Sequence, residues 1–268
     1  FSTSNPNVGM GTGDKTVTDT RNSWATRGFF ARLNYDYQSR YLLEVNGRYD
    51  GSSRFASDHR WGFFPSVSVG WNLTEEPFME NYRHVLSQFK VRASIGRLGN
   101  QAGAGLYTFG STMGISSKLG GYIFNDGRHL YLNAPGVINP ATTWEKVDSK
   151  NLGIDFGFFN GTLSGSFDIF QRDTKDMLGP GVDFPDFFGA SAPQTNNAQL
   201  RNRGWELTLN YRGKIGNDIT YNIGGSLSDA TAEVTAYENP TGADPVNNWY
   251  KGKKVGEIWG YRTDGIIQ

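Results

Sequence analysis

The sequence predicts an all-β fold: about eight strands of a transmembrane antiparallel β-barrel that is itself larger than these strands. Three observations predict it. Apolar and polar residues alternate along eight stretches, the connections between stretches are alternately short and long, and aromatic residues gather where the apolar faces end. The mean hydropathy of −0.52, beside 14% aromatic residues and 35 glycines, fits this class because only every second residue of a barrel strand faces lipid.

Alternation with a period of two is the primary signal of a strand with two unlike faces. In the first stretch Phe29, Ala31 and Leu33 share one face, while Arg32 and Asn34 share the other. Each stretch has about ten residues, the length that a tilted strand needs to cross a bilayer. The predicted strands are residues 29–37, 41–50, 61–71, 89–96, 152–158, 163–169, 205–211 and 219–228.

The connections between the strands differ in length from one rim to the other. Asn160-Gly161 predicts a two-residue hairpin, since both residues tolerate positive φ, and Thr74 predicts the N-cap of a short helix with Glu75 and Glu76 in its first turn. Short turns on one rim and long loops on the other are typical of outer-membrane barrels. Short connections are 38–40, 160–161 and 213–218, a medium one is 72–88, and long ones are 51–60, 100–142, 173–195 and 230 onward.

The two faces indicate a wide barrel. Small lumen-side residues such as Ser66, Ser68 and Ser164 could not fill the interior of a narrow barrel, so we expect a lumen that holds water or a plug. The aromatic residues expected at the membrane interfaces are Tyr35, Tyr37, Tyr41, Trp61, Phe63, Trp71, Trp205 and Tyr211. The expected division is an extracellular loop or chain end at 1–26, β-barrel strands with loops at 27–229, and a truncated extracellular loop at 230–268.

Several classes of site are not supported. The 26 basic and 26 acidic residues cancel, so no nucleic-acid partner is expected. There is no cysteine, and His59, His84 and His129 lack ligand spacing, so we expect no metal and no cofactor. The stretch 9–16 looks like a phosphate loop, but Asp14 stands where a P-loop has glycine beside its lysine and would repel phosphate. No catalytic signature occurs, so we expect no enzyme.

Two stretches, Asp50–Phe55 and Arg60–Trp71, carry a family resemblance. They resemble the barrel of SusC/RagA-type TonB-dependent outer-membrane transporters. The resemblance implies a barrel of about 22 strands, an N-terminal plug, contact with the TonB complex, a SusD-like surface lipoprotein as a lid, and oligosaccharide or peptide substrates. The plug and the closing strands are not among these residues, so we expect a piece of a longer protein. Further matching stretches follow in the family's order at residues 92–101, 144–155, 202–206 and 260–266.

The long loops hold the candidate binding residues. Aromatic rings beside hydrogen-bonding groups suit sugar rings, peptide side chains or a protein partner such as the lid, whereas the alternative is that the loops only pack on one another. The candidates for contact with substrate or partner are Asn100, Gln101, Tyr107, Tyr122, Asp126, Arg128, Phe187, Phe188, Trp249 and Tyr250.

A rim loop at Asp50–Arg54 is expected to be structural. Asp50 and Gly51 are expected to form a tight turn, pinned by donors of Ser52, Ser53 and Arg54, because turn residues usually serve the turn. Arg97 falls on the apolar register of its strand. We expect it at the outer rim, where outer-membrane lipid phosphates are near.

The function expected from these features is that of a barrel segment in an active importer, spanning the outer membrane of a Gram-negative bacterium in many passes. Two alternatives stay open at this point. One is a self-contained small outer-membrane barrel with a structural or adhesion role. The other is a soluble β-sandwich carbohydrate-binding module, which would stay in buffer where either barrel requires detergent.

Overall fold

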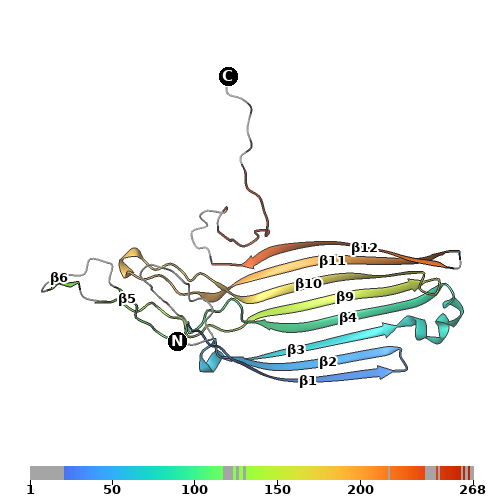
Figure 1. Cartoon of the computed structure of the whole chain (residues 1–268), viewed down its shortest axis with the longest axis horizontal. Coiled ribbons are helices and arrows are strands. Elements are labelled where there is room, and N and C mark those ends of the chain that lie inside the picture. Colours follow the sequence, from blue (N-terminus) through green and yellow to red (C-terminus); the bar gives the residue numbers. More distant parts are fainter. Residues whose placement is uncertain are drawn as a thin grey trace, which may run out of the picture.

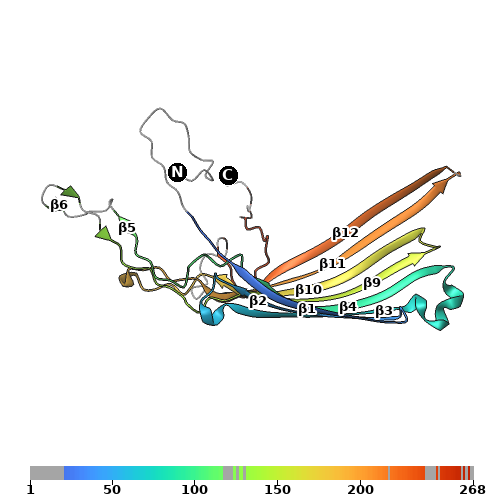
Figure 2. The ribbon, with the colours of Figure 1, turned by 60° about the horizontal axis from the view of Figure 1, so that its bottom comes forward.

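The computed structural model describes residues 21–116, 123–124, 127–128, 131–216, 218–238, 246, 248–260, 262 and 265. Eight long antiparallel strands form one curved, single-layered sheet, in the order β1-β2-β3-β4-β9-β10-β11-β12 (Figure 1 and Figure 2). The strands are β1 (Thr26–Tyr37), β2 (Tyr41–Ser52), β3 (Trp61–Asn72), β4 (Leu86–Asn100), β9 (Glu145–Phe158), β10 (Leu163–Gly179), β11 (Thr195–Ile215) and β12 (Ile219–Ala236). The predicted all-β fold with eight strands is confirmed.

Short elements occupy the connections. Two small ladders lie between β4 and β9, formed by β5 (Ile115–Ser116) with β8 (Tyr131–Leu132) and by β6 (Ile123–Phe124) with β7 (Gly127–Arg128). The 3₁₀ helices are η1 (Ser57–His59), η2 (Leu73–Glu75), η3 (Pro77–Tyr82) and η4 (Asp186–Phe188). No helix in these residues is long and apolar enough to cross a membrane.

The strands are longer than the predicted ten residues, and range from 12 to 21. The difference is largest in β10 and β11. β10 continues through 173–179, inside the expected loop 173–195, and β11 begins at Thr195, ten residues before the predicted strand that starts at Trp205. There one cross-strand pair is charged, that of Arg201 with Asp173, whose Nε and Oδ1 atoms lie 2.5 Å apart. Twenty-one residues extend for about 69 Å at ~3.3 Å per residue, so β11 projects well beyond a ~30 Å hydrocarbon layer.

The turns at the short-loop end differ in detail from the prediction. Asn160 and Gly161 have positive φ as expected, but Phe159 does too. Phe158 pairs with Leu163, so the turn contains four residues rather than two.

Thr74 is not an N-cap, because it lies inside η2. Its hydroxyl instead donates to Asn72 Oδ1 at 2.8 Å and accepts from the backbone N–H of Phe89 at 3.1 Å. Thr74 therefore joins the connection between β3 and β4 to the start of β4.

Large apolar side chains on one face of the sheet are exposed, with fractions of 64% for Leu33, 50% for Val69 and 57% for Ile95. Among the described residues no second sheet packs against this one (Figure 2). In a water-soluble sandwich these side chains would form the core between two sheets. The continuous apolar face instead fits contact with lipid, and we call it the outward face.

The apolar band crosses the sheet diagonally, because the strands are tilted. The hydrogen-bonded row through Val45 ends at Thr231 on β12, yet the apolar residues of β12 are centred on Ile223, eight residues away. From β2 to β12 the sheet makes six steps, or about 29 Å at ~4.8 Å each. A tilt of about 40° gives an offset of about 24 Å, or about seven residues. The full row is Val45, Val67, Ile95, Lys150, Gln171, Arg203 and Thr231.

Candidate functional site

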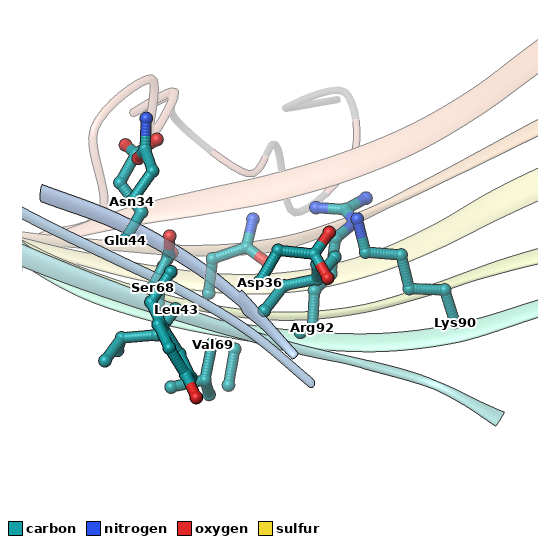
Figure 3. Close-up of a pocket in the computed structure, with 14 residues that line it drawn as sticks. Asn34, Asp36, Leu43, Glu44, Ser68, Val69, Lys90 and Arg92 are labelled. Carbon is teal, nitrogen blue, oxygen red and sulfur yellow. The ribbon is translucent and has the colours of Figure 1, made fainter. Parts of the chain in front are cut away.

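The opposite, lumen-facing side of the sheet is polar. It contains a hollow of about 490 Å³ lined by residues of β1 to β4 and β9. In Figure 3 the polar groups of Glu44, Lys90 and Arg92 lie on one side of the ribbon, whereas Leu43 and Val69 point to the other. Further polar residues of the lining are Asn34, Asp36, Ser68, Ser94 and Asn151. Carboxylates, cations and hydroxyls are mixed here, so the wall can hydrogen-bond a polar surface without strongly favouring one sign of charge.

One guanidinium joins three strands across this wall. Arg92 on β4 reaches Asp155 on β9, with Nε 3.1 Å from Oδ1, and Asp168 on β10, with Nη2 2.6 Å from Oδ2. Gly153 lies between Arg92 and Asp168 in the same row. A Cβ at Gly153 would be 2.8 Å from Cζ of Arg92 and 2.5 Å from Oδ1 of Asp168. Glycine is therefore required at position 153 if the Arg92 side chain is to cross β9 and reach Asp168.

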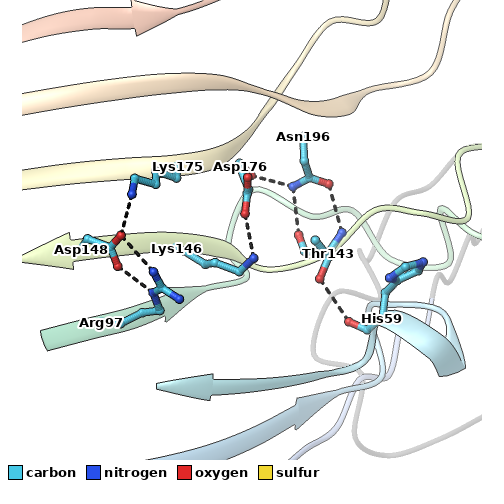
Figure 4. A network of polar contacts seen from close by, with 8 residues as sticks. All are labelled: His59, Arg97, Thr143, Lys146, Asp148, Lys175, Asp176 and Asn196. Atoms are coloured by element: carbon cyan, nitrogen blue, oxygen red, sulfur yellow. Dashed lines mark hydrogen bonds and ion pairs between the residues drawn. The ribbon is translucent and has the colours of Figure 1, made fainter. Parts of the chain in front are cut away.

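A second polar network ties the long-loop end of β4, β9 and β10 together on the outward side (Figure 4). Arg97 grips Asp148 through two bonds, Nε to Oδ1 at 2.6 Å and Nη2 to Oδ2 at 3.1 Å, and Lys175 Nζ lies 2.9 Å from Oδ2 of the same carboxylate. Arg97 thus lies on the outward register near the rim, with a partner across the strand. Lys146 pairs with Asp176 at 2.8 Å in the same way.

The expected rim turn begins later than predicted. Asp50 and Gly51 belong to β2, where Gly51 pairs with both Arg27 and Trp61. A Cβ at Gly51 would be 2.8 Å from the Trp61 ring, so glycine here lets the indole lie across the strand rather than serving a turn. Asp50 is instead paired with Arg48, at 3.1 Å between Oδ2 and Nε.

Ser52, Ser53 and Arg54 make local contacts, but of the three expected side-chain donors only Arg54 donates in the hydrogen bonds found here. Ser52 Oγ accepts from the backbone N–H of Arg54 at 3.2 Å, and Ser53 Oγ accepts from that of Ala25 at 2.9 Å. Arg54 Nη1 donates to the carbonyl of Ala104 at 2.7 Å, and its guanidinium lies 5.0 Å from the Trp24 ring centroid.

A small aromatic core lies behind this loop. Phe55, Phe64 and Trp144 are buried, and the Trp144 ring centroid is 5.3 Å from that of Phe55 and 5.4 Å from that of Phe64. Trp144 Nε1 also donates to the carbonyl of Arg60 at 2.9 Å. Together with Ala104 these residues form the one buried apolar cluster found in the described residues. It holds two connections, residues 53–60 and 101–144, against β3 at the long-loop rim.

Asn100, Gln101 and Tyr107 gather at this same rim. Asn100 Nδ2 donates to Glu145 Oε2 at 2.7 Å, which ties β4 to β9. The Gln101 carbonyl accepts from Arg54 Nη1 at 3.5 Å. Tyr107 donates to the carbonyl of Ser23 at 2.8 Å and stays half exposed.

Tyr107 also lines a hollow of about 390 Å³ between loops. Its other walls come from residues 104–112 and 137–142, with Leu178, Pro193 and Gln194. Tyr107 is therefore a candidate binding residue with a defined concave site beside it.

The remaining candidates lie on other segments. Phe187, 91% exposed, and Phe188 are in η4, and the Phe188 ring centroid is 4.7 Å from that of Phe184. Trp249 faces Tyr237 at 6.0 Å between centroids, and the Tyr250 hydroxyl lies 3.4 Å from Glu257 Oε1. Tyr122, Asp126 and the side chain of Arg128 lie outside the described residues, as does the stretch 9–16. Among described residues no group of three His, Asp or Glu side chains could hold a metal.

These features define a class of protein. Tilted antiparallel strands with an apolar outward face, a polar lumen wall and long loops at one rim are a segment of a membrane β-barrel. Residues 1–258 match the family described as "TonB dependent receptor-like, beta-barrel". The chain belongs to this family, which is one of receptors rather than of enzymes.

Relatives and solved structures agree with the SusC/RagA resemblance. The TonB-dependent receptor SusC of Bacteroides thetaiotaomicron is 34% identical over 223 residues, which cover 83% of this chain and 22% of the relative. The TonB-dependent receptor P26 of Formosa agariphila is 37% identical over 182 residues, covering 68% and 18%. The structure of the RagAB peptide transporter matches with a TM-score of 0.68 at 27% identity, covering 80% and 22%. The chain thus spans about a fifth of these proteins, and the partial barrel is confirmed.

Proposed function

We propose that this chain is the barrel segment of a TonB-dependent active transporter in the outer membrane of a Gram-negative bacterium. The transporter imports oligosaccharides or peptides beneath a SusD-like lipoprotein lid. The observation that carries the proposal is the two-faced sheet, apolar outward and mixed-charge toward the lumen, in a chain of the TonB-dependent receptor family. The TonB complex supplies the energy by acting on a plug that the whole transporter contributes.

The lumen wall suits passage of a large polar solute. Arg92 is held by two carboxylates, so its charge is compensated and its guanidinium is oriented along the wall rather than into the lumen. A wall with compensated charges offers many weak hydrogen bonds and no single strong binding site. Such a surface allows a plug to move and a solute to pass without being trapped.

The long-loop rim suits recognition. The hollow beside Tyr107 has hydrogen-bonding and apolar walls, and Phe187 presents an almost fully exposed ring on a neighbouring connection. Exposed aromatic rings commonly anchor protein partners and also stack on sugars. We assign the hollow to solute contact and the η4 ring to the lid.

The test is energy-dependent uptake by the whole transporter in its own cells. Labelled oligosaccharides and labelled peptides are offered to cells with the intact TonB complex and to cells lacking it. Accumulation of one class that stops without TonB supports the proposal and names the substrate class. Accumulation that is equal in both strains, or a protein that partitions into buffer after cell lysis, contradicts it.

A further inference from the structure

We propose that the outward face carries a binding site for the phosphate group of an outer-leaflet glycolipid, with Lys150 as its principal cation. The site is a hollow of about 480 Å³ in the outward surface. This proposal rests on the proposed location in the outer membrane, with the long-loop rim facing the outside of the cell, and does not depend on which solute is transported. Its lining is Pro65, Ser66, Val67, Ile95, Gly96, Arg97, Asp148, Lys150, Asp173 and Lys175.

The hollow exists because β3 and β4 part at this level. Their pairing ends at Ser66 and Gly96, although β3 continues to Trp61 and β4 to Asn100. Pro65 follows at the point of separation, and proline has no N–H with which to continue the ladder. The gap between the two strands leaves a depression that is open toward the membrane.

The depth of the hollow matches the lipid headgroups. Lys150 lies two residues beyond Leu152, which belongs to the apolar row with Ala93 and Ile169. Two residues are about 7 Å along a strand, and the headgroup layer is about 5–7 Å thick on each side of the hydrocarbon. The hollow therefore has apolar walls at Val67 and Ile95 toward the acyl chains, with cations at the level of the phosphates.

The charge around the hollow is complementary to an anion. Asp148 is bound by both Arg97 and Lys175, and Asp173 is bound by Arg201. The hollow thus has two carboxylates, those of Asp148 and Asp173, and three cations in its lining. A fourth cation, Arg201, binds Asp173 from outside the lining. Lys150 is exposed and has no ion pair or hydrogen bond among the contacts found in the described residues. A phosphate placed here would gain Lys150 directly, with Arg97 and Lys175 already oriented beside it.

The experiment uses the full transporter, purified in a neutral detergent and analysed by native mass spectrometry. The added probes are bisphosphorylated lipid A and the same lipid with both phosphates removed. We expect the phosphorylated form to be retained preferentially and Lys150→Ala to weaken its binding by about fivefold, since one cation near a lipid surface contributes about that factor. Lys150→Arg should restore binding.

The matched control is Lys214→Ala, an exposed lysine near the opposite end of the strands on β11. It should leave binding unchanged, and retained heat-modifiable migration in gels shows that each variant folds. Equal losses for Lys150→Ala and Lys214→Ala, or equal binding of the phosphorylated and dephosphorylated lipids, would overturn the proposal. Uptake of solute is measured separately, so failure of this site is distinguishable from failure of the proposed transport function.

Discussion

Replacing Gly153 with alanine should break the bridge that Arg92 makes across the lumen wall. The new methyl group would occupy space 2.5 Å from Asp168 Oδ1 and 2.8 Å from Arg92 Cζ, so at least one of these groups must move. Overpacking costs about 1–3 kcal/mol, and a hydrogen bond between charged groups contributes about 1.5–3 kcal/mol. Because the Arg92 side chain is 35% exposed, water compensates part of the loss. We expect unfolding to be easier by about 1–2 kcal/mol.

The assay is denaturant unfolding of the whole transporter in detergent, followed by gel migration and intrinsic fluorescence. Gly225→Ala is the matched control, because Gly225 lies in β12 with nothing within 4 Å of an added Cβ. In a background of Asp168→Ala the Gly153→Ala change should cost less, since one of the two clashing groups is gone. An unfolding midpoint for Gly153→Ala equal to that of Gly225→Ala would show that the added methyl group does not disturb the Arg92 bridge.

Three further predictions concern the two rims. The Trp71 indole N–H and the Tyr41 hydroxyl donate hydrogen bonds to the Glu76 carboxylate, and these bonds, with that from Trp71 the larger cause, lower the pKa of Glu76. The stability that the ionised carboxylate gives the folded protein is therefore present above the unfolded pKa of about 4.3, and it is lost as the pH falls through the lower folded pKa. Thermal melts from pH 6 to 3 should therefore show a component that Glu76→Gln lacks; identical profiles would contradict this. Trp144→Ala should cost about 3–5 kcal/mol at the long-loop rim and expose it to limited proteolysis, whereas unchanged cleavage would argue against a core there. Phe187→Ala should leave stability unchanged but weaken lid binding by about fivefold or more in titrations with the purified lipoprotein, and unaltered affinity would remove η4 from the lid interface.

The strands and their faces could be predicted from sequence because the signal is local. Alternation of apolar and polar residues places Val67 and Val69 outward and Ser66 and Ser68 toward the lumen without knowledge of any partner strand. The same register placed Arg97 on the outward side near the rim, where the structure has it.

The extensions of β10 and β11 could not be predicted in this way. Their outward positions carry Asp173, Lys175 and Arg201 in place of apolar residues, which looks like a loop until the strands are aligned. Once they are aligned, Arg201 faces Asp173 across the ladder, and the two side chains form an ion pair. The four-residue turn at 159–162 was not predicted because phenylalanine rarely adopts positive φ, as Phe159 does here.

The lumen and rim contacts depend on distant parts of the chain. Arg92 and Asp155 meet only because β4 pairs with β9 across a connection of more than forty residues. The cluster of Phe55, Phe64 and Trp144 likewise joins two connections to β3, and their proximity follows from sheet order. Composition indicated neither the Arg92–Asp155 contact nor the aromatic cluster. Glycine inside a strand, as at Gly153, does often mark a place where another group approaches the backbone closely.

We expect one face of this sheet to meet lipid and the other to meet an aqueous lumen. The described chain has no cysteine, so single cysteines can be introduced into a cysteine-free full transporter and spin-labelled in liposomes. Along β3, collisions with oxygen should dominate at Val67 and Val69, and collisions with a water-soluble nickel complex should dominate at Ser66 and Ser68. Collisions with oxygen should be most frequent for labels near Val45 on β2 and near Ile223 on β12, because the strands are tilted. Equal access to the nickel complex at all four β3 positions would contradict the account.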